Sequence, residues 1–233
     1  MNEFRVLEVK ESVFKDNDQL AGKLREELRK RKLFLLNLMS SPGSGKTTTL
    51  KQTISALKDE MSVGVMEADI DSDVDARAIS ETGVKVIQLH TGGMCHLDAD
   101  MTKQGLEGLG TQDLDLAILE NVGNLVCPAE FDTGASKNAM ILSVPEGDDK
   151  PLKYPLMFSM VDVLIINKID TIAFFDFDFE ACKDRVRKLN PDIAIIPISA
   201  KTGEGIDRWV DWLSALGHKF GDVFYAAILY SCS

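Results

Sequence analysis

The sequence predicts an α/β protein whose core is a doubly wound, mostly parallel sheet of about seven strands flanked by helices. Apolar runs of strand length recur along the chain, and stretches with helical spacing separate many of them. Several runs are nearly continuous in Val, Ile and Leu, as expected of strands that helices cover on both faces. A glycine-rich loop also joins the first of these runs to a helix, which is the P-loop arrangement. Because ligands bind such sheets beyond the carboxyl ends of the strands, the motifs at those ends indicate the function.

The elements follow one another in a regular order. Residues 1–17 carry little signal, whereas Leu20, Leu24 and Leu28, spaced by four, predict a helix within 18–32. Strands are expected at 33–39, 63–67, 86–89, 116–120, 139–144, 163–167 and 194–198, and helices at 47–58, 99–109, 180–189 and 206–216. We therefore expect an N-terminal extension with its helix at 1–32, the main domain at 33–217, and a C-terminal tail of unassigned role at 218–233.

Composition and charge argue against several classes of protein. The formal net charge of −11 would repel a polyanion on average, so a nucleic-acid partner is not expected. No stretch approaches the roughly 20 apolar residues that cross a bilayer. The N-terminus has no apolar run behind a basic head, so no signal peptide is expected. These features predict a cytoplasmic protein with no membrane partner.

The first strand leads into a phosphate-binding loop. The run is Ser40, Ser41, Pro42, Gly43, Ser44, Gly45, Lys46, Thr47 and Thr48, and a helix follows. Glycines here let backbone N–H groups turn toward phosphate oxygens, and the helix N-terminus adds partial positive charge. Lys46 is expected between the β- and γ-phosphates, with the Thr47 hydroxyl on Mg²⁺. Ser40 stands where the usual pattern begins with Gly; the alternative is a glycine-rich turn that merely opens a helix.

Two later strand ends predict that the base is guanine. Asn167, Lys168 and Asp170 form an Asn-Lys-x-Asp arrangement some 120 residues after the P-loop. The carboxylate of Asp170 can accept hydrogen bonds from N1 and the exocyclic N2 of guanine, whereas adenine would leave it unpaired. The stem of Lys168 can stack on the base. A further motif, Ser199, Ala200 and Lys201, resembles the loop that closes GTPase base pockets. Together the motifs predict GTP and GDP as ligands.

Carboxylates at two other strand ends predict a magnesium site. Glu120 and Gly123 match in role the Asp-x-x-Gly motif in which the acid approaches Mg²⁺ and the glycine N–H senses the γ-phosphate. Asp69 or Asp75 is expected to ligate Mg²⁺ or to orient the attacking water, with Lys46, Thr47, Asp75 and Glu120 forming the catalytic set. Asp71 and Asp73, in the same acidic run, are interpreted as solvated. Since no glutamine is evident for positioning the water, a slow intrinsic rate is expected.

Two thiols and an imidazole lie between these segments. Cys95 and His96 are adjacent at a predicted turn, and Cys127 follows Glu120 by seven residues. Such soft ligands suit Zn²⁺ or Ni²⁺ better than Mg²⁺. Spacing alone leaves this interpretation open, because a single cysteine is commonly a small buried apolar residue. Three ligands also fall short of a closed tetrahedral site, which a second subunit would complete. Cys182 and Cys232 are interpreted as structural or incidental, and no role is assigned to His90 or His218.

Four segments carry a resemblance to a known family. The run from Ser41 to Thr47, the Gly-Gly-Met-Cys-His-Leu-Asp-Ala segment at 92–99, the Glu-Asn-Val-Gly-Asn-Leu-Val-Cys-Pro-Ala segment at 120–129 and Val-Pro-Glu-Gly-Asp-Asp-Lys-Pro at 144–151 resemble the HypB family of hydrogenase nickel-incorporation GTPases. The resemblance covers about residues 5–217 and implies a SIMIBI-class GTPase domain at 33–217. It also implies a homodimer when GTP is bound, with an interfacial Ni²⁺/Zn²⁺ site at Cys95, His96 and Cys127.

The resemblance further implies a HypA-type metallochaperone and the NiFe hydrogenase large subunit as partners. This chain departs from members that carry an N-terminal Cys-x-x-Cys-Gly-Cys site or a His-rich stretch, since it has no cysteine before Cys95 and three histidines in all. Nickel storage is therefore not expected.

Three alternatives to this function remain open. One is a GTPase serving another metalloenzyme, of the urease or cobalamin-dependent mutase type. Another is a metabolic nucleotide-dependent kinase, which need not prefer guanine. A purely structural interaction protein is the third, and it would have no use for Lys46, Thr47 and Glu120 as they are arranged.

Overall fold

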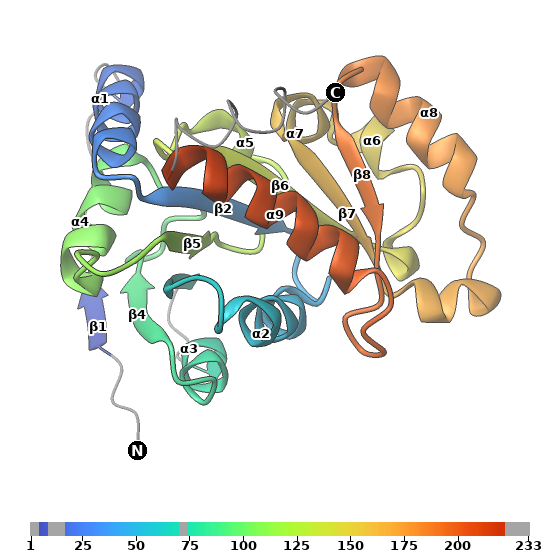
Figure 1. The fold of residues 1–233 in the computed structure, drawn as a ribbon. Coiled ribbons are helices and arrows are strands. Elements are labelled where there is room, and N and C mark those ends of the chain that lie inside the picture. The colour runs from blue at the N-terminus through green and yellow to red at the C-terminus, as the bar shows by residue number, and fades with distance from the viewer. Residues whose placement is uncertain (1–4, 9–16, 70–73, 222–233) are drawn as a thin grey trace, which may run out of the picture.

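The computed structural model describes residues 5–8, 17–69 and 74–221, and these form one eight-stranded sheet with helices on both faces (Figure 1). The strand order is β1-β4-β3-β5-β2-β6-β7-β8, and every neighbouring pair is parallel. The strands are β1 (Arg5–Glu8), β2 (Phe34–Ser40), β3 (Val63–Asp69), β4 (Lys85–His90), β5 (Leu116–Glu120), β6 (Lys137–Ser143), β7 (Val163–Asn167) and β8 (Ala194–Pro197).

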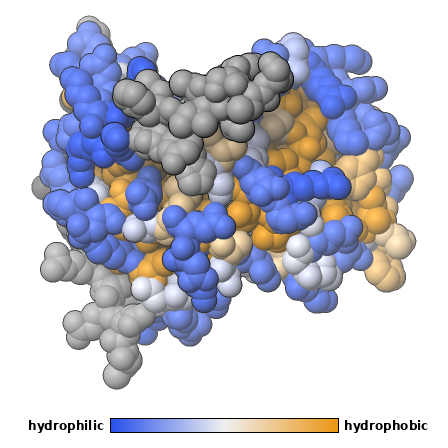
Figure 2. Space-filling view, viewed as in Figure 1, coloured by the Kyte–Doolittle hydropathy of each residue, from blue (hydrophilic) through white to orange (hydrophobic). Residues whose placement is uncertain are grey.

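The helices divide between the two faces of the sheet. Their bounds are α1 (Asn17–Lys30), α2 (Lys46–Leu57), α3 (Val74–Ser80), α4 (Ala99–Leu109), α5 (Cys127–Glu130), α6 (Lys150–Lys153), α7 (Pro155–Met160), α8 (Phe179–Leu189) and α9 (Ile206–Gly221), with short 3-10 helices η2 (Val144–Glu146) and η3 (Ile169–Phe174). Helices α2, α3 and α9 pack over one face. Helices α1 and α4 cover half of the other face, and α5, α7 and α8 cover the rest. Figure 2 shows hydrophilic residues over the outer helix surfaces, with apolar residues visible mainly between them.

Burial on both faces explains why the strands are so apolar. All residues of β2, β5 and β7 are buried. Alternate residues of one strand enter different cores: Val65 joins the α2–α3–α9 side and Met66 the α1–α4 side. This arrangement leaves no solvent-facing row of polar residues, so continuous Val, Ile and Leu runs are what the fold requires.

The sequence-based expectation for the fold is confirmed, with one strand added. All seven expected strands are present within a residue or two, and helix α4 has the expected bounds. The eighth strand, β1, lies in the stretch that carried little signal, where it pairs with β4 at the edge of the sheet. The expected C-terminal tail overlaps α9 as far as Gly221, and residues 222–233 lie outside the described part of the chain. Among the described helices, none is long and apolar enough to cross a membrane.

Candidate functional site

The P-loop lies between β2 and α2, at the carboxyl edge of the sheet. Gly43 and Gly45 have φ values of 74° and 99°, a backbone conformation that favours glycine. The Lys46 ammonium group donates to Ser40 Oγ at 3.0 Å, and that hydroxyl donates to the Ser41 carbonyl oxygen at 2.8 Å. Ser40, which replaces the usual glycine, therefore supplies an oxygen that holds the lysine across the loop.

The first of the two segments expected to recognise the base contacts the P-loop directly. The Asn167 amide nitrogen donates to the Ser44 carbonyl oxygen at 2.9 Å, while its oxygen accepts from the backbone N–H groups of Lys168 and Ala200 at 2.7 and 3.0 Å. A Cβ at Gly45 would lie 2.5 Å from Asn167 Nδ2, so only glycine permits this approach. One buried asparagine thus joins three loops that the sequence separates widely.

The expected base-binding residues also lie together. Ser199 Oγ donates to Asp170 Oδ1 at 2.7 Å, which orients the carboxylate that is expected to meet guanine. Lys168 adopts a φ of 63° and donates through Nζ to the Gly43 carbonyl oxygen at 2.6 Å. Its aliphatic stem therefore extends toward the P-loop. Lys201, the last residue of the third motif, is exposed.

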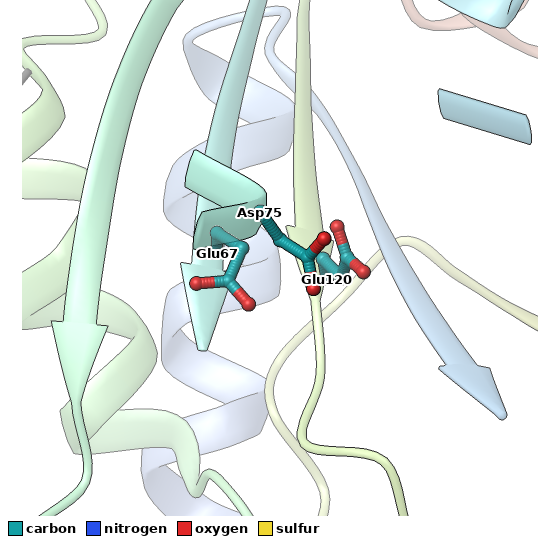
Figure 3. A group of neighbouring side chains, drawn as sticks. All are labelled: Glu67, Asp75 and Glu120. Atoms are coloured by element: carbon teal, nitrogen blue, oxygen red, sulfur yellow. The ribbon is translucent and has the colours of Figure 1, made fainter. Parts of the chain in front are cut away.

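A group of three carboxylates lies beside the P-loop, on β3, α3 and β5 (Figure 3). Glu67 and Glu120 are register partners on neighbouring strands and are 3% and 1% exposed. Asp75 lies on α3, and one oxygen from each of the three carboxylates lies within 4.8 Å of the others. The Thr47 hydroxyl donates to Asp75 Oδ1 at 2.8 Å, which connects the group to the P-loop.

Burial makes the two glutamates reluctant to ionise. Burial, with repulsion from Glu120 next in size, raises the pKa of Glu67 to about 8. Burial likewise raises the pKa of Glu120 to about 7, although the positive charge of Lys46 opposes this rise. Each has a buried Oε2 without a hydrogen-bond partner among the described residues. The two orphaned carboxylate oxygens belong to a group that also contains Asp75, to which the Thr47 hydroxyl donates. Oxygen atoms of this kind are the hard ligands that Mg²⁺ prefers, so the residues present fit that ion.

Asp69, which the sequence offered as an alternative magnesium ligand, is not part of this compact group. It ends β3 and is half-buried, and its negative charge adds to the rise in the pKa of both glutamates. Glu67, the last residue of the strand predicted at 63–67 and the start of the acidic run, was assigned no role from the sequence. The register of β3 with β5 is what places it beside Glu120. Asp71 and Asp73 lie outside the described residues.

Two of the three expected soft-metal ligands lie in contact. Cys95 Sγ donates to Cys127 Sγ across 2.8 Å, and both residues are partly exposed. This hydrogen bond, with burial adding to it, raises the pKa of the Cys95 thiol above its usual value. The pair can present two sulfur atoms to one metal ion once the thiols lose their protons.

His96 lies beside Cys95 but is also held by an aromatic contact. Its Nδ1 is 4.0 Å from Cys95 Sγ, within the range of a hydrogen bond to sulfur, and its ring stacks on Phe131 with centroids 3.5 Å apart. The residue is 4% exposed. Among the described residues the compact ligand group of three is therefore the carboxylate group rather than Cys95, His96 and Cys127. Cys182 is fully buried, and burial raises its pKa to about 12, consistent with a structural role. Cys232 and the side chain of His218 lie outside the described part of the chain.

The segment from Glu120 to Cys127 connects the carboxylates to the thiols. Asn121 accepts from the Val122 N–H at 2.9 Å and donates to Asn37 Oδ1 at 3.1 Å. A Cβ at Gly123 would lie 3.2 Å from Pro42 Cγ, so this backbone lies against the P-loop. The nucleotide site and the thiol pair are thus separated by one short segment held at both ends.

Comparison with known proteins gives consistent matches. The family model for the CobW/HypB/UreG nucleotide-binding domain matches residues 34–197. The hydrogenase maturation factor HypB of Escherichia coli K12 is 46% identical over 91% of this chain and 73% of its own length. The probable HypB of Methanocaldococcus jannaschii is 36% identical over 89% of this chain and 94% of its own length.

Solved structures agree with these matches. The crystal structure of Helicobacter pylori HypB in complex with nickel superimposes with a TM-score of 0.82 at 38% identity, covering 88% of this chain and 96% of that one. HypB from Archaeoglobus fulgidus gives a TM-score of 0.81 at 37% identity, covering 87% and 98% of the two chains. The signal recognition particle receptor FtsY of Elizabethkingia anophelis, at 15% identity and a TM-score of 0.53, shares the fold and covers 83% and 72%.

Proposed function

Because the chain belongs to the HypB family of hydrogenase maturation factors, within the CobW/HypB/UreG group of P-loop nucleotide-binding proteins, we propose that it is a GTP-hydrolysing metallochaperone that delivers nickel to NiFe hydrogenase. The observation that carries the GTPase part is the joining of three loops by Asn167, with Asp170 oriented by Ser199. In this arrangement the Asp170 carboxylate would meet the paired N–H donors of guanine. We therefore expect GTP and GDP, rather than adenine nucleotides, as ligands.

The residues expected around the phosphates support nucleotide binding and hydrolysis. Lys46 and the N-terminus of α2 offset phosphate charge, and the glycines of the loop allow backbone N–H groups to approach it. Thr47, Asp75, Glu120 and Glu67 would hold Mg²⁺, which when bound neutralises charge on the β- and γ-phosphates. Gly123, beside the P-loop, is positioned for its N–H to meet the γ-phosphate. The motif that begins at Glu120, Glu-Asn-Val-Gly, has no glutamine to position the attacking water, so hydrolysis is expected to be slow.

Nickel is the cargo in this proposal, and Cys95 and Cys127 are its first ligands. Two thiolates suit Ni²⁺ and Zn²⁺ but do not complete a four-coordinate site. A second copy of the chain, brought together when GTP is bound, would contribute the same residues across a two-fold axis. His96 joins the site in this proposal by turning out of its stack on Phe131.

Nucleotide and metal are coupled through the segment that Glu120 begins and Cys127 ends. Ordering of Gly123 by the γ-phosphate fixes this segment and with it the second thiol, whereas hydrolysis loosens it and releases nickel. A HypA-type metallochaperone and the large subunit of NiFe hydrogenase are the proposed partners, in the cytoplasm. The net charge of −11 and the absence of a membrane-crossing helix among the described residues are consistent with this setting.

The test is equilibrium Ni²⁺ and Zn²⁺ binding, with particle mass measured in GDP and in a non-hydrolysable GTP analogue. We expect metal stoichiometry and dimer population to rise together in the analogue, and Cys95→Ala to abolish the metal. Lys46→Ala should abolish GTP turnover. A Cys127→Ala protein whose metal affinity still responds normally to nucleotide would contradict the coupling. Nucleotide binding without any metal binding would leave a GTPase with a different client.

A second candidate client has one observation in its favour. A relative from Helicobacter hepaticus, 40% identical over 89% of this chain, is named a hydrogenase/urease maturation factor. Nickel delivery to urease would use the same thiol pair and the same cycle of GTP binding and hydrolysis. Restoration of urease activity, but not hydrogenase activity, in cells lacking their own nickel-delivery GTPase would favour that client.

A further inference from the structure

Helix α1 contacts both of the segments that carry the candidate nickel ligands. The first segment, 95–99, ends at the first residue of α4, and the second, 127–135, begins with α5. Asn17, the first residue of α1, is 6% exposed and lies between them. Its Nδ2 donates to the Asp132 carbonyl oxygen at 3.0 Å, while its Oδ1 accepts from the Ala99 N–H at 2.9 Å. One side chain therefore bridges the two segments.

A second contact from the same helix fixes the later segment. Arg25 Nη2 donates to both carboxylate oxygens of Asp132, at 2.7 and 2.9 Å, and Arg25 Nε donates to the Ala135 carbonyl oxygen at 2.8 Å. Asp132 also accepts from the Gly134 N–H at 2.9 Å. A planar guanidinium group bound at three points sets orientation as well as distance, which a flexible surface charge does not.

The packing between α1 and this segment is unusually close. Gly134 has a φ of 76°, and a Cβ there would lie 2.9 Å from Leu24 Cδ2 and 3.2 Å from the Ala21 carbonyl oxygen. Leu24 also shares a hydrophobic cluster with Leu97, from the first segment, and with Ala135, from the second. In Figure 1 α1 lies beside α4, which follows the first segment. Polar and apolar contacts therefore act on the same two segments.

Each segment begins with one of the two cysteines. His96, which follows Cys95, stacks on Phe131, which precedes Asp132. We propose that α1 acts as a clamp that holds Cys95 next to Cys127, with Asn17 and Arg25 as positioning residues for metal binding. This inference rests on the proposed function in one respect, namely that the two thiols bind the cargo metal. Groups that orient metal ligands without touching the metal typically change its affinity about 10- to 100-fold.

The first test measures nickel affinity by competition with a chelating dye, in the full-length chain. Arg25→Ala is compared with Arg29→Ala, which removes an exposed arginine one turn further along the same helix. We expect Arg25→Ala and Asn17→Ala to weaken Ni²⁺ binding roughly tenfold or more. GTP affinity, measured on the same samples, should match the wild type in all of them. Nickel and GTP affinities that fall together would indicate a general structural role and would overturn the proposal. Nickel affinity equal to that of the wild type in both variants would also overturn it.

The second test does not depend on nickel. Phenylarsine oxide forms two As–S bonds with two neighbouring thiols and releases one water molecule, so its binding reports whether Cys95 and Cys127 are held together. Cys127→Ala supplies the background from other thiols. The clamp predicts slower bridging in Arg25→Ala and Asn17→Ala than in wild type and Arg29→Ala. If wild type binds no nickel while bridging still depends on Arg25, the clamp stands and the nickel function fails. Equal bridging in all four proteins would refute the clamp.

Discussion

Replacing Glu67 by Gln should make the nucleotide-free, metal-free protein more stable at pH 8. The folded-state pKa of Glu67 is about 8 against an ordinary value of 4.5, chiefly because of burial. That difference corresponds to about 5 kcal/mol of preference for the protonated carboxyl. Because folding raises this pKa, the contribution of the protonated Glu67 carboxyl to the free energy of unfolding is fully present below pH 4.5. This contribution is lost as the pH rises toward 8. Glutamine is neutral at every pH and keeps the side-chain length, so it avoids this loss.

The assay is urea unfolding in EDTA at intervals from pH 5 to 8.5. Wild-type stability should fall by a few kcal/mol over this range, since neighbouring carboxylates share part of the effect, and Glu67→Gln should show a flatter profile. Glu107→Gln, which changes an exposed glutamate on α4, is the matched control. Parallel profiles for wild type and Glu67→Gln, or a variant less stable than wild type at pH 8, would refute the reasoning.

Three further predictions follow from single contacts. Asp170→Asn should weaken GTP binding by about 100-fold or more and shift the preference to XTP, because the O2 atom of xanthine accepts a hydrogen bond from the new amide. Unchanged GTP affinity in a nucleotide titration would count against the guanine assignment. Cys127→Ala removes the hydrogen bond that raises the pKa of Cys95, so iodoacetamide should alkylate Cys95 faster at pH 8, and an equal or slower rate would contradict this. Asn37→Ala removes the partner of the buried Asn121 amide nitrogen and of the half-buried Asn138 amide oxygen. It should lower the free energy of unfolding by about 1–3 kcal/mol, and an unchanged midpoint in urea unfolding would contradict this.

The parts of the site that could be predicted from sequence are those defined by short, local patterns. The P-loop and the loops at Asn167 and Ser199 each combine a strand end with side chains whose chemistry is specific. Their convergence follows because parallel strands bring their carboxyl ends to one edge. The structure joins these three loops through Asn167, as that logic requires.

The parts that could not be predicted depend on the register between strands and on packing. Glu67 ends the strand predicted at 63–67, but only the register of β3 with β5 places it beside Glu120. Strand β1 has four residues, Arg5–Glu8, and too few alternations for a pattern to stand out. The burial of His96 against Phe131 requires two segments 35 residues apart to meet, and nothing in either segment indicates the other.

The clamp contacts also determine when the thiol pair can assemble during synthesis. Asn17 and Arg25 bind Asp132 across sequence separations of 115 and 107 residues. More than half of the chain must therefore leave the ribosome before helix α1 can reach its place. Contacts of such long range form slowly, because the intervening chain must first be ordered. Until then the nascent chain carries two separate cysteines rather than the paired thiols of the proposed metal site. On that proposal, premature capture of a metal ion by the unfinished protein is disfavoured.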